Sequence, residues 1–244
     1  MQMQSRNIKM EVNNFTVIES IYGRIIVDRH CDYQIDALAK TGRTHIESEL
    51  KNIFNVLDHV PDGSIIIDGG TNIGLFSIPV AQKVKNRNIK VVGFEPQRIL
   101  AYALGGTIAL NDLENCWVHN LALSDIIRTV RLPEVNYNKV ADYGTVQVSD
   151  DVQISENKYL NNILVDAVSI DSLELPNIKF IKLDIEGYEI PAINGAINTI
   201  RKDKPFLWIE YFLVGLDKIV ETLNKIAPYK IYIMDPQNIL CVPE

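Results

Sequence analysis

The sequence predicts an α/β fold built on a doubly wound, mostly parallel Rossmann-like sheet. Short apolar runs typical of buried strands alternate with longer segments of helical spacing, as in strand–helix–strand units. A glycine-rich turn follows the first of these strands, in SIIIDGGTNIGLFSIPVA (64–81). The chain has 244 residues, of which 47% are hydrophobic and 23% charged, so it is large enough for one such sheet with a packed core.

The first 60 residues are expected to form an N-terminal β-hairpin followed by a helix. FTVIESIYGRIIVDRH (15–30) alternates in polarity and turns at Tyr22-Gly23, which is typical of a hairpin. THIESELKNIFNVLDHV (44–60) has apolar residues at helical spacing, and Pro61-Asp62-Gly63 ends it. Residues 61–244 are then expected to form the main domain.

The main domain is expected to contain five core strands, four helices and a terminal hairpin. The strands are Ser64–Asp68, IKVVGFEP (89–96), CWVHNLALSD with its exit loop (116–125), IKFIKLDIEGYE (178–189) and PFLWIEY (205–211). The first helix follows the glycine-rich turn and is expected to be shortened or kinked by Pro79. The other three helices are expected at 98–112, 190–201 and 216–226, and the terminal hairpin at 229–242. Short alternating runs among Asn, Asp and Gly predict an antiparallel insertion at about 126–169.

The glycine-rich turn is unlike a dinucleotide fingerprint. Thr71 or Asn72 stands where G-x-G-x-x-G needs its second glycine, which lets the backbone approach a pyrophosphate. S-adenosylmethionine has no phosphate, and it needs an acid for its ammonium group and a small residue beside its methionine part. Asp68 and Gly70 supply both, and Glu95 ends the next strand, where an acid can accept the ribose hydroxyls. A helix cap, an ordinary turn and a solvated strand end would explain each feature alone, but their joint occurrence favours a cofactor site.

The fourth core strand carries a second polar cluster. Lys182, Asp184 and Glu186 alternate, so they face one way while the chain stays extended. A lysine inside a central strand is costly unless it is paired, so a structural ion pair is one interpretation and a catalytic cluster is the other. Glu210 ends the neighbouring strand, and these carboxylates form either a solvated rim or a place for proton removal or a metal ion.

These residues resemble the FkbM family of S-adenosylmethionine-dependent methyltransferases. The resemblance rests on IDGGTNIGLFSIPVA, GFEPQ, LALSD, SIDSL and IKLDIEGYEIPAINGA, which occur in the family's order between Ser64 and Tyr211. It implies a class I methyltransferase that methylates hydroxyls of sugars, polysaccharides or secondary metabolites, with residues 61–244 as the cofactor-binding catalytic domain. The expected cofactor residues are Asp68, Gly69, Gly70, Thr71, Asn72, Gly74, Glu95, Pro96, Ser124 and Asp125. Gly70-Thr71 replaces the family's usual Gly-Ala, and Pro79 in the first helix is a second departure.

The expected chemistry is in-line methyl transfer with removal of a proton from the acceptor hydroxyl. Asp184 is the first choice as base or metal ligand, Glu186 the second, Glu210 a partner and Lys182 an organiser. Oxygen ligands from Asp184 and Glu210 could suit Mg²⁺, although the absence of a His cluster means that the sequence does not demand a metal. The insertion at 126–169 is expected to form part of the acceptor pocket, with Tyr137, Tyr143 or Tyr159 packing on sugar faces.

Two alternatives stay open at this point: an NAD-dependent oxidoreductase on the same sheet, and a non-catalytic module that binds a cofactor or glycan. The net charge of −7 argues against a nucleic-acid partner. No apolar run reaches about 18 residues, and the N-terminus lacks a signal peptide's apolar stretch, so we expect a cytoplasmic protein without a membrane partner. The three cysteines show no metal-binding spacing. The acceptor is expected to be a small molecule or glycan, and the sequence leaves the oligomeric state open.

Overall fold

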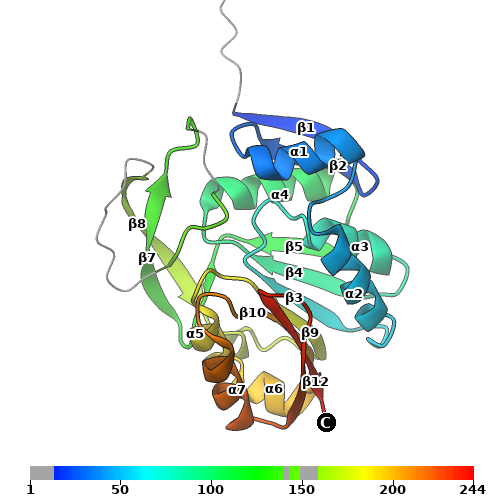
Figure 1. The fold of residues 1–244 in the computed structure, drawn as a ribbon, viewed down its shortest axis with the longest axis vertical. Coiled ribbons are helices and arrows are strands. Elements are labelled where there is room, and N and C mark those ends of the chain that lie inside the picture. The colour runs from blue at the N-terminus through cyan, green and yellow to red at the C-terminus, as the bar shows by residue number, and fades with distance from the viewer. Residues whose placement is uncertain (1–13, 140–142, 149–158) are drawn as a thin grey trace, which may run out of the picture.

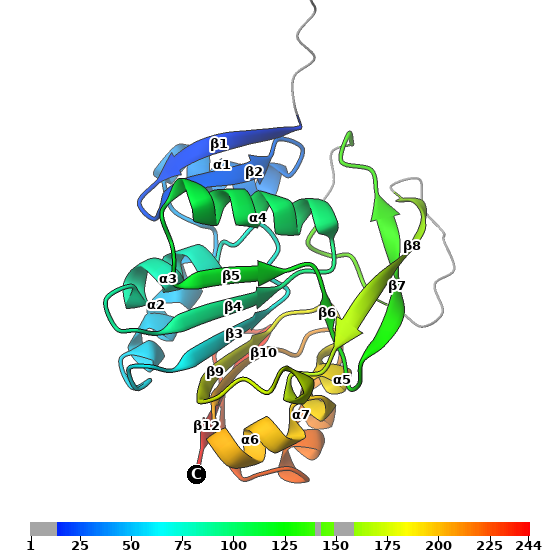
Figure 2. The same cartoon turned by 180° about the vertical axis from the view of Figure 1, so that it is seen from behind.

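The computed structural model describes residues 14–139, 143–148 and 159–244, which form three sheets and the helices around them (Figures 1 and 2). The largest sheet has seven strands in the order β11-β12-β10-β9-β3-β4-β5. These strands are β3 (Ile65–Gly69), β4 (Lys90–Phe94), β5 (Cys116–His119), β9 (Ile178–Leu183), β10 (Phe206–Glu210), β11 (Tyr229–Ile233) and β12 (Asn238–Pro243). All five predicted core strands and the terminal hairpin are confirmed.

The central sheet is parallel except for one strand. β12 runs antiparallel to both of its neighbours, β10 and β11, and the other strands share one direction. From β3 the chain continues to β4 on one side, whereas β9 lies on the other side of β3. Such a reversal of strand order is where open α/β sheets leave a crevice for ligands. The predicted doubly wound sheet is therefore confirmed, and its switch point lies at β3 and β9.

Helices cover both faces of this sheet and make it the middle layer of the molecule (Figure 1). One face packs against α2 (Glu47–Leu57) and α3 (Ser77–Val84), and a single apolar cluster joins residues such as Ile53 and Ile78 to Ile66 and Trp208 on the strands. The other face packs against α5 (Glu189–Asn194), α6 (Ile197–Asp203) and α7 (Leu216–Asn224). The strands are buried on both faces, which explains their nearly continuous apolar sequences.

The N-terminal hairpin lies outside the central sheet. β1 (Phe15–Ser20) and β2 (Gly23–Asp28) pair antiparallel as predicted and pack with α1 (Asp32–Thr41) beside α4 (Arg98–Leu110). The Ile26 N–H donates to Thr107 Oγ1 of α4 at 2.9 Å. Buried Ile25 and Val27 share an apolar cluster with Leu100, so the hairpin is fixed to the outside of α4. Helix α1 is an element that the sequence patterns did not predict.

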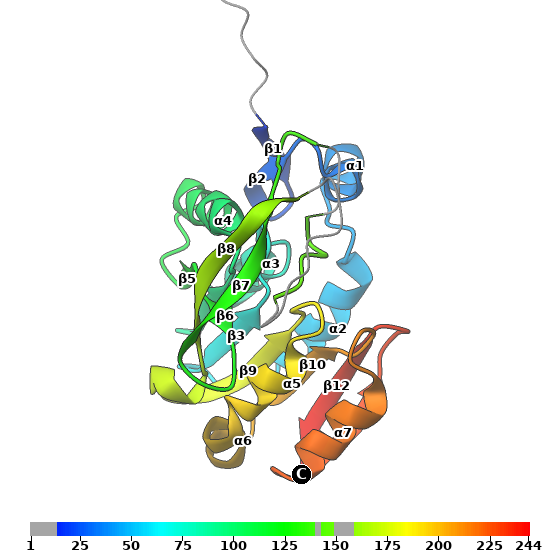
Figure 3. The same cartoon turned by 90° about the vertical axis from the view of Figure 1, so that its left-hand side faces the viewer.

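The insertion forms a separate small sheet beside the carboxyl ends of the central strands (Figure 3). β7 (Arg128–Val135) pairs antiparallel with β8 (Tyr159–Val168), which confirms the predicted antiparallel character. The short strand β6 (Ala122–Leu123) adds to the other side of β8 in parallel. A 3₁₀ turn, η1 (Asp171–Leu173), then leads from β8 into β9.

The predicted helix at 190–201 is wrong, because the structure divides this segment into α5 and α6. A Cβ atom on Gly195 would lie 2.0 Å from the carbonyl oxygen of Ser124, so the chain passes too close to that loop for a side chain. The second helix then starts anew, with the Asp171 carboxylate accepting the N–H groups of Asn198 and Thr199 at 2.9 and 2.8 Å. Pro79 lies in the first turn of α3, where its missing N–H is tolerated, and this helix is short as predicted.

Candidate functional site

One cavity opens at the carboxyl ends of β3, β4, β9 and β10, beside the switch point of the sheet. Its volume is about 340 Å³, within the range of small-molecule sites. The described residues that line it come from every part of the chain: His45, Ile46, Glu49, Gly70, Asn72, Phe94, Glu95, Pro96, Gln97, Ala122, Leu123, Gly144, Thr145, Val146, Val148, Asp184, Ile185, Glu186, Tyr188, Glu210, Gln237 and Asn238.

The turn after β3 forms one wall, and its glycines are required by close approach. Gly70 has φ +78°, and a Cβ atom there would lie 1.9 Å from the carbonyl oxygen of Asp184. No other residue fits this position without moving the backbone. Asn72 and Gly74 also have positive φ, and Asn72 lines the cavity, whereas Gly69, Thr71 and Gly74 are not among its lining residues. The turn is thus pressed against the end of β9.

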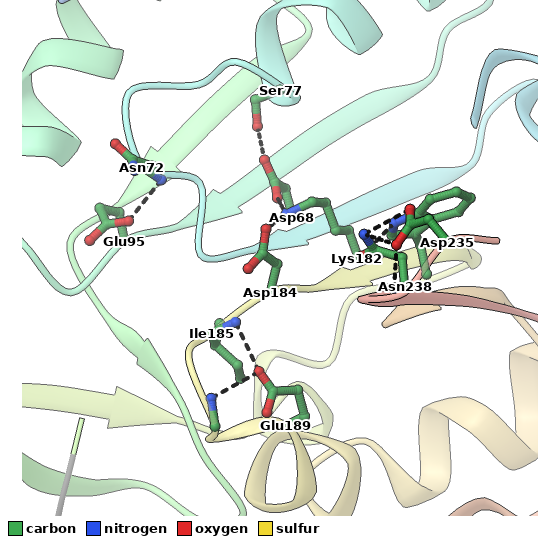
Figure 4. A network of polar contacts seen from close by, with 12 residues as sticks. Asp68, Asn72, Ser77, Glu95, Lys182, Asp184, Ile185, Glu189, Asp235 and Asn238 are labelled. Atoms are coloured by element: carbon green, nitrogen blue, oxygen red, sulfur yellow. Dashed lines mark hydrogen bonds and ion pairs between the residues drawn. The ribbon is translucent and has the colours of Figure 1, made fainter. Parts of the chain in front are cut away.

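Glu95 lies at the end of β4, as the sequence predicted, and faces the same cavity. Only 4% of it is exposed, and its carboxylate accepts the Asn72 N–H at 2.8 Å (Figure 4) and the Gln97 N–H at 2.8 Å. Burial raises the pKa of Glu95 to about 7, against the two N–H donors, which favour the ionised form. A carboxylate has about four acceptor sites, so two such bonds leave capacity for ligand hydroxyls.

Asp68 occupies a different environment from the one that the sequence indicated. It is fully buried and is not among the residues that line the cavity. Its Oδ2 accepts a hydrogen bond from Ser77 Oγ at 2.5 Å, and its Oδ1 lies 3.9 Å from Lys182 Nζ (Figure 4). Burial raises the pKa of Asp68, and Lys182 opposes this shift. The structure therefore brings Asp68 together with Lys182 below the cavity floor.

Lys182 forms the link between this buried acid and the cavity. Its Nζ donates to Asp184 Oδ2 at 2.8 Å and lies 5.6 Å from the centre of the Phe76 ring. Burial alone would lower the pKa of Lys182, but the carboxylates of Asp184, Asp68 and Glu49 raise it above the ordinary value. The ion pair of Lys182 and Asp184 is therefore present, while Asp184 is also part of the cavity wall.

Asp184, Glu186 and Glu210 form an acidic rim on the cavity. One carboxylate oxygen from each lies within 4.8 Å of the others, and all three residues are half-buried. Among the described residues, this is the group whose spacing could hold a metal ion, although acidic groups often gather without one. Burial, followed by the charges of Asp184 and Glu186, raises the pKa of Glu210 to about 8. The three carboxylates expected at two adjacent strand ends are thus brought together.

The strand alternation that the sequence analysis assumed stops earlier than expected. β9 ends at Leu183, and Glu186 and Gly187 have φ +56° and +94°. The Oε1 atom of Glu189 accepts the N–H groups of Ile185 and Gly187 at 3.1 and 3.2 Å and so stabilises this sharp turn (Figure 4). Glu186 therefore reaches the rim through the turn and not through extended alternation, while the turn at Gly187 is confirmed.

Ser124 and Asp125 lie next to the cavity but do not line it. Ser124 is buried, donates to Asp125 Oδ1 at 2.9 Å and accepts from Arg128 Nε at 3.1 Å. The residues just before them, Ala122 and Leu123, form the wall. Pro96 lines the cavity beside Glu95.

The insertion reaches the cavity through residues other than the expected tyrosines. Gly144, Thr145, Val146 and Val148 line it. Tyr143 is buried and Tyr137 packs on it with ring centroids 4.9 Å apart, and neither lines the cavity. The Tyr159 side chain lies outside the residues described in this detail.

Sequence reasoning missed two further walls, one before and one after the main motifs. His45 and Ile46 directly precede α2, Glu49 lies in its first turn, and Gln237 and Asn238 lie at the start of β12. The signal for Glu49 was available, because helical spacing places it on the buried stripe of α2 with Ile46 and Ile53. Burial raises the pKa of Glu49 to about 7.

Two further features bear on the sequence expectations. All three cysteines are buried thiols, and none of them is in a disulfide bond. None of the helices in the described part of the chain combines the length and apolar character that a bilayer-crossing segment requires.

Solved structures similar to this chain share its fold at low identity. A methyltransferase FkbM from Methylobacillus flagellatus matches with a TM-score of 0.53 and 22% identity over 73% of this chain and 43% of the other. Trm5b from Pyrococcus abyssi matches with a TM-score of 0.50 and 16% identity over 95% of this chain and 56% of the other. A third structure is the 16S rRNA N2 G1207 methyltransferase RsmC from T. thermophilus, in complex with AdoMet and guanosine. It matches with a TM-score of 0.50 and 10% identity over 94% of this chain and 50% of the other. The chain thus spans about half of each structure's length.

A family model identifies the chain more directly. Comparison with curated proteins finds no match. The methyltransferase FkbM domain, however, matches residues 68–229, which include the turn after β3, Glu95 and the whole acidic rim. This match favours a methyltransferase over the oxidoreductase alternative, and it covers most of the chain. The chain therefore belongs to the FkbM methyltransferase family.

Proposed function

We propose that this protein transfers a methyl group from S-adenosylmethionine to a hydroxyl of a sugar, polysaccharide or secondary metabolite. One observation carries the proposal: a single cavity is lined by the glycine turn, by Glu95 and by three clustered carboxylates. The turn and Glu95 suit a nucleoside, and the carboxylates suit removal of a proton. The AdoMet bound in the RsmC complex supports the choice of cofactor for this fold.

In this proposal Glu95 accepts the ribose hydroxyls, and Gly70 lets the methionine part pass close to the end of β9. The walls at Pro96, Ala122 and Leu123 flank the base. Because Asp68 is sealed below the floor, it acts as a positioning residue that fixes Lys182 and, through it, Asp184. The cofactor supplies an electrophilic methyl group, so the chain's own task is alignment and proton removal.

The acidic rim is proposed to remove the acceptor's proton. Asp184 is the first candidate, since Lys182 fixes its orientation at 2.8 Å. Glu210 is the second, because its pKa of about 8 places its proton exchange close to neutral pH. Glu186 completes the rim from the turn. We also propose that Asp184 and Glu210 hold Mg²⁺, and this proposal has its own test. If the ion is required, a chelator should abolish activity and added Mg²⁺ should restore it.

The acceptor is proposed to be a small molecule or glycan, with the cytoplasm as the site of action. An RNA acceptor, as the name of RsmC would imply, is disfavoured by the net charge of −7 and by the acidic cavity. The test combines calorimetry with a turnover assay. S-adenosylhomocysteine should bind, NAD should not, and a hydroxylated acceptor panel should yield methylated product. Cofactor binding without turnover on any acceptor would favour the non-catalytic module instead.

A further inference from the structure

The ionisable side chains on the cavity wall are strongly unbalanced in charge. Its described lining contains five acids and, apart from His45, no basic residue. Glu95 is assigned to the ribose in the proposed function, so four acids remain for the acceptor: Glu49, Asp184, Glu186 and Glu210. An anionic acceptor would be repelled by them, and a cationic one would be attracted.

The nearest cation is already engaged by other carboxylates. Lys182 Nζ lies 2.8 Å from Asp184 and 3.9 Å from Asp68, below the cavity wall. The Glu49 and Glu210 carboxylates are partly withdrawn from water and have no hydrogen bond or ion pair to a described residue, so Lys182 acts on them only through its charge at longer range. Partly desolvated carboxylates without partners are unfavourable, and a positively charged ligand group would relieve this.

Glu49 is the member of this group that the family match does not include. It lies on α2, outside residues 68–229, and projects from the buried stripe of that helix into the cavity. Its neighbour Glu47 is different: its carboxylate binds Tyr22 and Arg43 and belongs to the packing of the N-terminal segment. The Glu49 carboxylate contacts no such partner among the described residues and is stabilised by the more distant charge of Lys182, which leaves it open to a ligand group.

We propose that Glu49 is a specificity-determining residue that selects an acceptor carrying a protonated amine near the hydroxyl to be methylated, and that phosphorylated acceptors are rejected. This inference rests on the proposed methyl transfer and adds the charge class of its acceptor. The ammonium group forms charge-assisted hydrogen bonds with the Glu49 carboxylate. The N-terminal segment thereby contributes recognition to a cavity whose chemistry comes from the motifs.

The test uses the full chain loaded with S-adenosylhomocysteine and three probes that differ in charge: glucosamine, glucose and glucose 6-phosphate. Binding is measured by ligand-observed NMR at a pH above about 7, where Glu49 is ionised, and below the pKa of the amine. Glucosamine should bind about 10-fold more tightly than glucose, the scale of one added charge-assisted hydrogen bond, and glucose 6-phosphate should bind most weakly. Glu49→Gln should bring the three affinities together, whereas Glu49→Asp should keep their order.

The matched control is Glu221→Gln, which removes the same charge from an exposed position on α7 outside the cavity. It should keep the order of the three probes. Equal binding of glucosamine and glucose by the wild-type chain, no binding of glucosamine, or an unchanged order in Glu49→Gln would overturn the inference. A Glu49→Gln variant that loses affinity for S-adenosylhomocysteine and keeps its sugar preference would also overturn it, since Glu49 would then serve the cofactor. Failure of the wild-type chain to bind S-adenosylhomocysteine at all would instead refute the proposed function.

Discussion

Two polar clusters lie near the carboxyl ends of the central strands, and they differ in burial, in hydrogen bonding and in the balance of charge. The buried network consists of Asp68, Ser77 and Lys182, and the acidic rim of Asp184, Glu186 and Glu210. In the network the acid is fully buried, hydrogen-bonded and opposite a lysine. In the rim three carboxylates lie within 4.8 Å of one another, and the same lysine reaches only one of them directly.

The difference shows that residue type and strand position do not by themselves decide the role of an acid. The role depends on solvent access and on whether a positive charge or a hydrogen-bond donor balances the carboxylate. A buried, paired carboxylate contributes to folding, whereas an accessible one without such a partner can exchange protons and bind ligands. Changes in the network should therefore appear mainly in stability, and changes in the rim mainly in turnover and pH dependence. Four measurements can break or sharpen this contrast.

The largest effect is expected for Lys182→Met, which leaves Asp68 buried without its cation. Breaking one partner of a buried ion pair costs about 3–5 kcal/mol, so the free energy of unfolding in urea should fall by that amount. Lys218→Met, at an exposed position on α7, is the control and should unfold like the wild-type chain. An unchanged unfolding midpoint for Lys182→Met would show that the buried network does not contribute to the stability of the fold.

Asp184→Asn tests the residue that belongs to the rim and also touches the network. If Asp184 removes the proton, turnover should fall by roughly 10²-fold or more, while affinity for S-adenosylhomocysteine stays close to wild type. The amide keeps the shape of the carboxylate but loses the charge that pairs with Lys182. If the role of Asp184 is purely structural, the variant should therefore have a lower melting temperature. A variant that melts early but retains turnover per folded molecule would place Asp184 with the network.

Glu95→Ala probes a third situation, an acid that is buried yet faces the cavity. Loss of two charge-assisted hydrogen bonds to the ribose should weaken S-adenosylhomocysteine binding by about 2–3 kcal/mol in calorimetry. Glu114→Ala, at an exposed site near the opposite ends of the strands, serves as control. Unaltered cofactor affinity in Glu95→Ala would limit Glu95 to holding the N–H groups of Asn72 and Gln97.

The smallest effect concerns the pH dependence of stability at Glu210. Burial and the neighbouring acids raise its folded pKa to about 8 from 4.5, so the folded chain binds more protons than the unfolded chain between these values. Its contribution is therefore fully present below the unfolded pKa and is lost as pH rises through about 8. Relative to the wild-type chain, Glu210→Gln should gain melting temperature above this window. If the melting temperatures of the two proteins change with pH in the same way across this window, the charge of Glu210 in the folded chain is already balanced by its surroundings.

The sequence was enough to predict the strands, the ligand-binding edge of the sheet and the acidic rim, because local patterns of residues indicate each of them. Buried strands read as apolar runs, and acids at their carboxyl ends share one edge of a parallel sheet. It could not tell that Asp68 points below the floor while Glu95 points into the cavity, since both simply end a strand. That choice depends on Ser77 and Lys182, which approach Asp68 from other segments. The break between α5 and α6 was invisible for the same reason, because it depends on the Ser124 loop that passes Gly195.

The strand order of the central sheet has a consequence for how fast the site can form. β3 pairs with β9, and the two strands are separated by β4, β5 and the whole insertion along the chain. β12 is inserted between β10 and β11, and its first residue, Asn238, lines the cavity. Contacts between distant segments require large loops to close before they stabilise anything, so such topologies fold slowly. During refolding, cofactor binding should therefore be among the last signals to return, after helical structure, because the final strand must enter the sheet before the cavity exists.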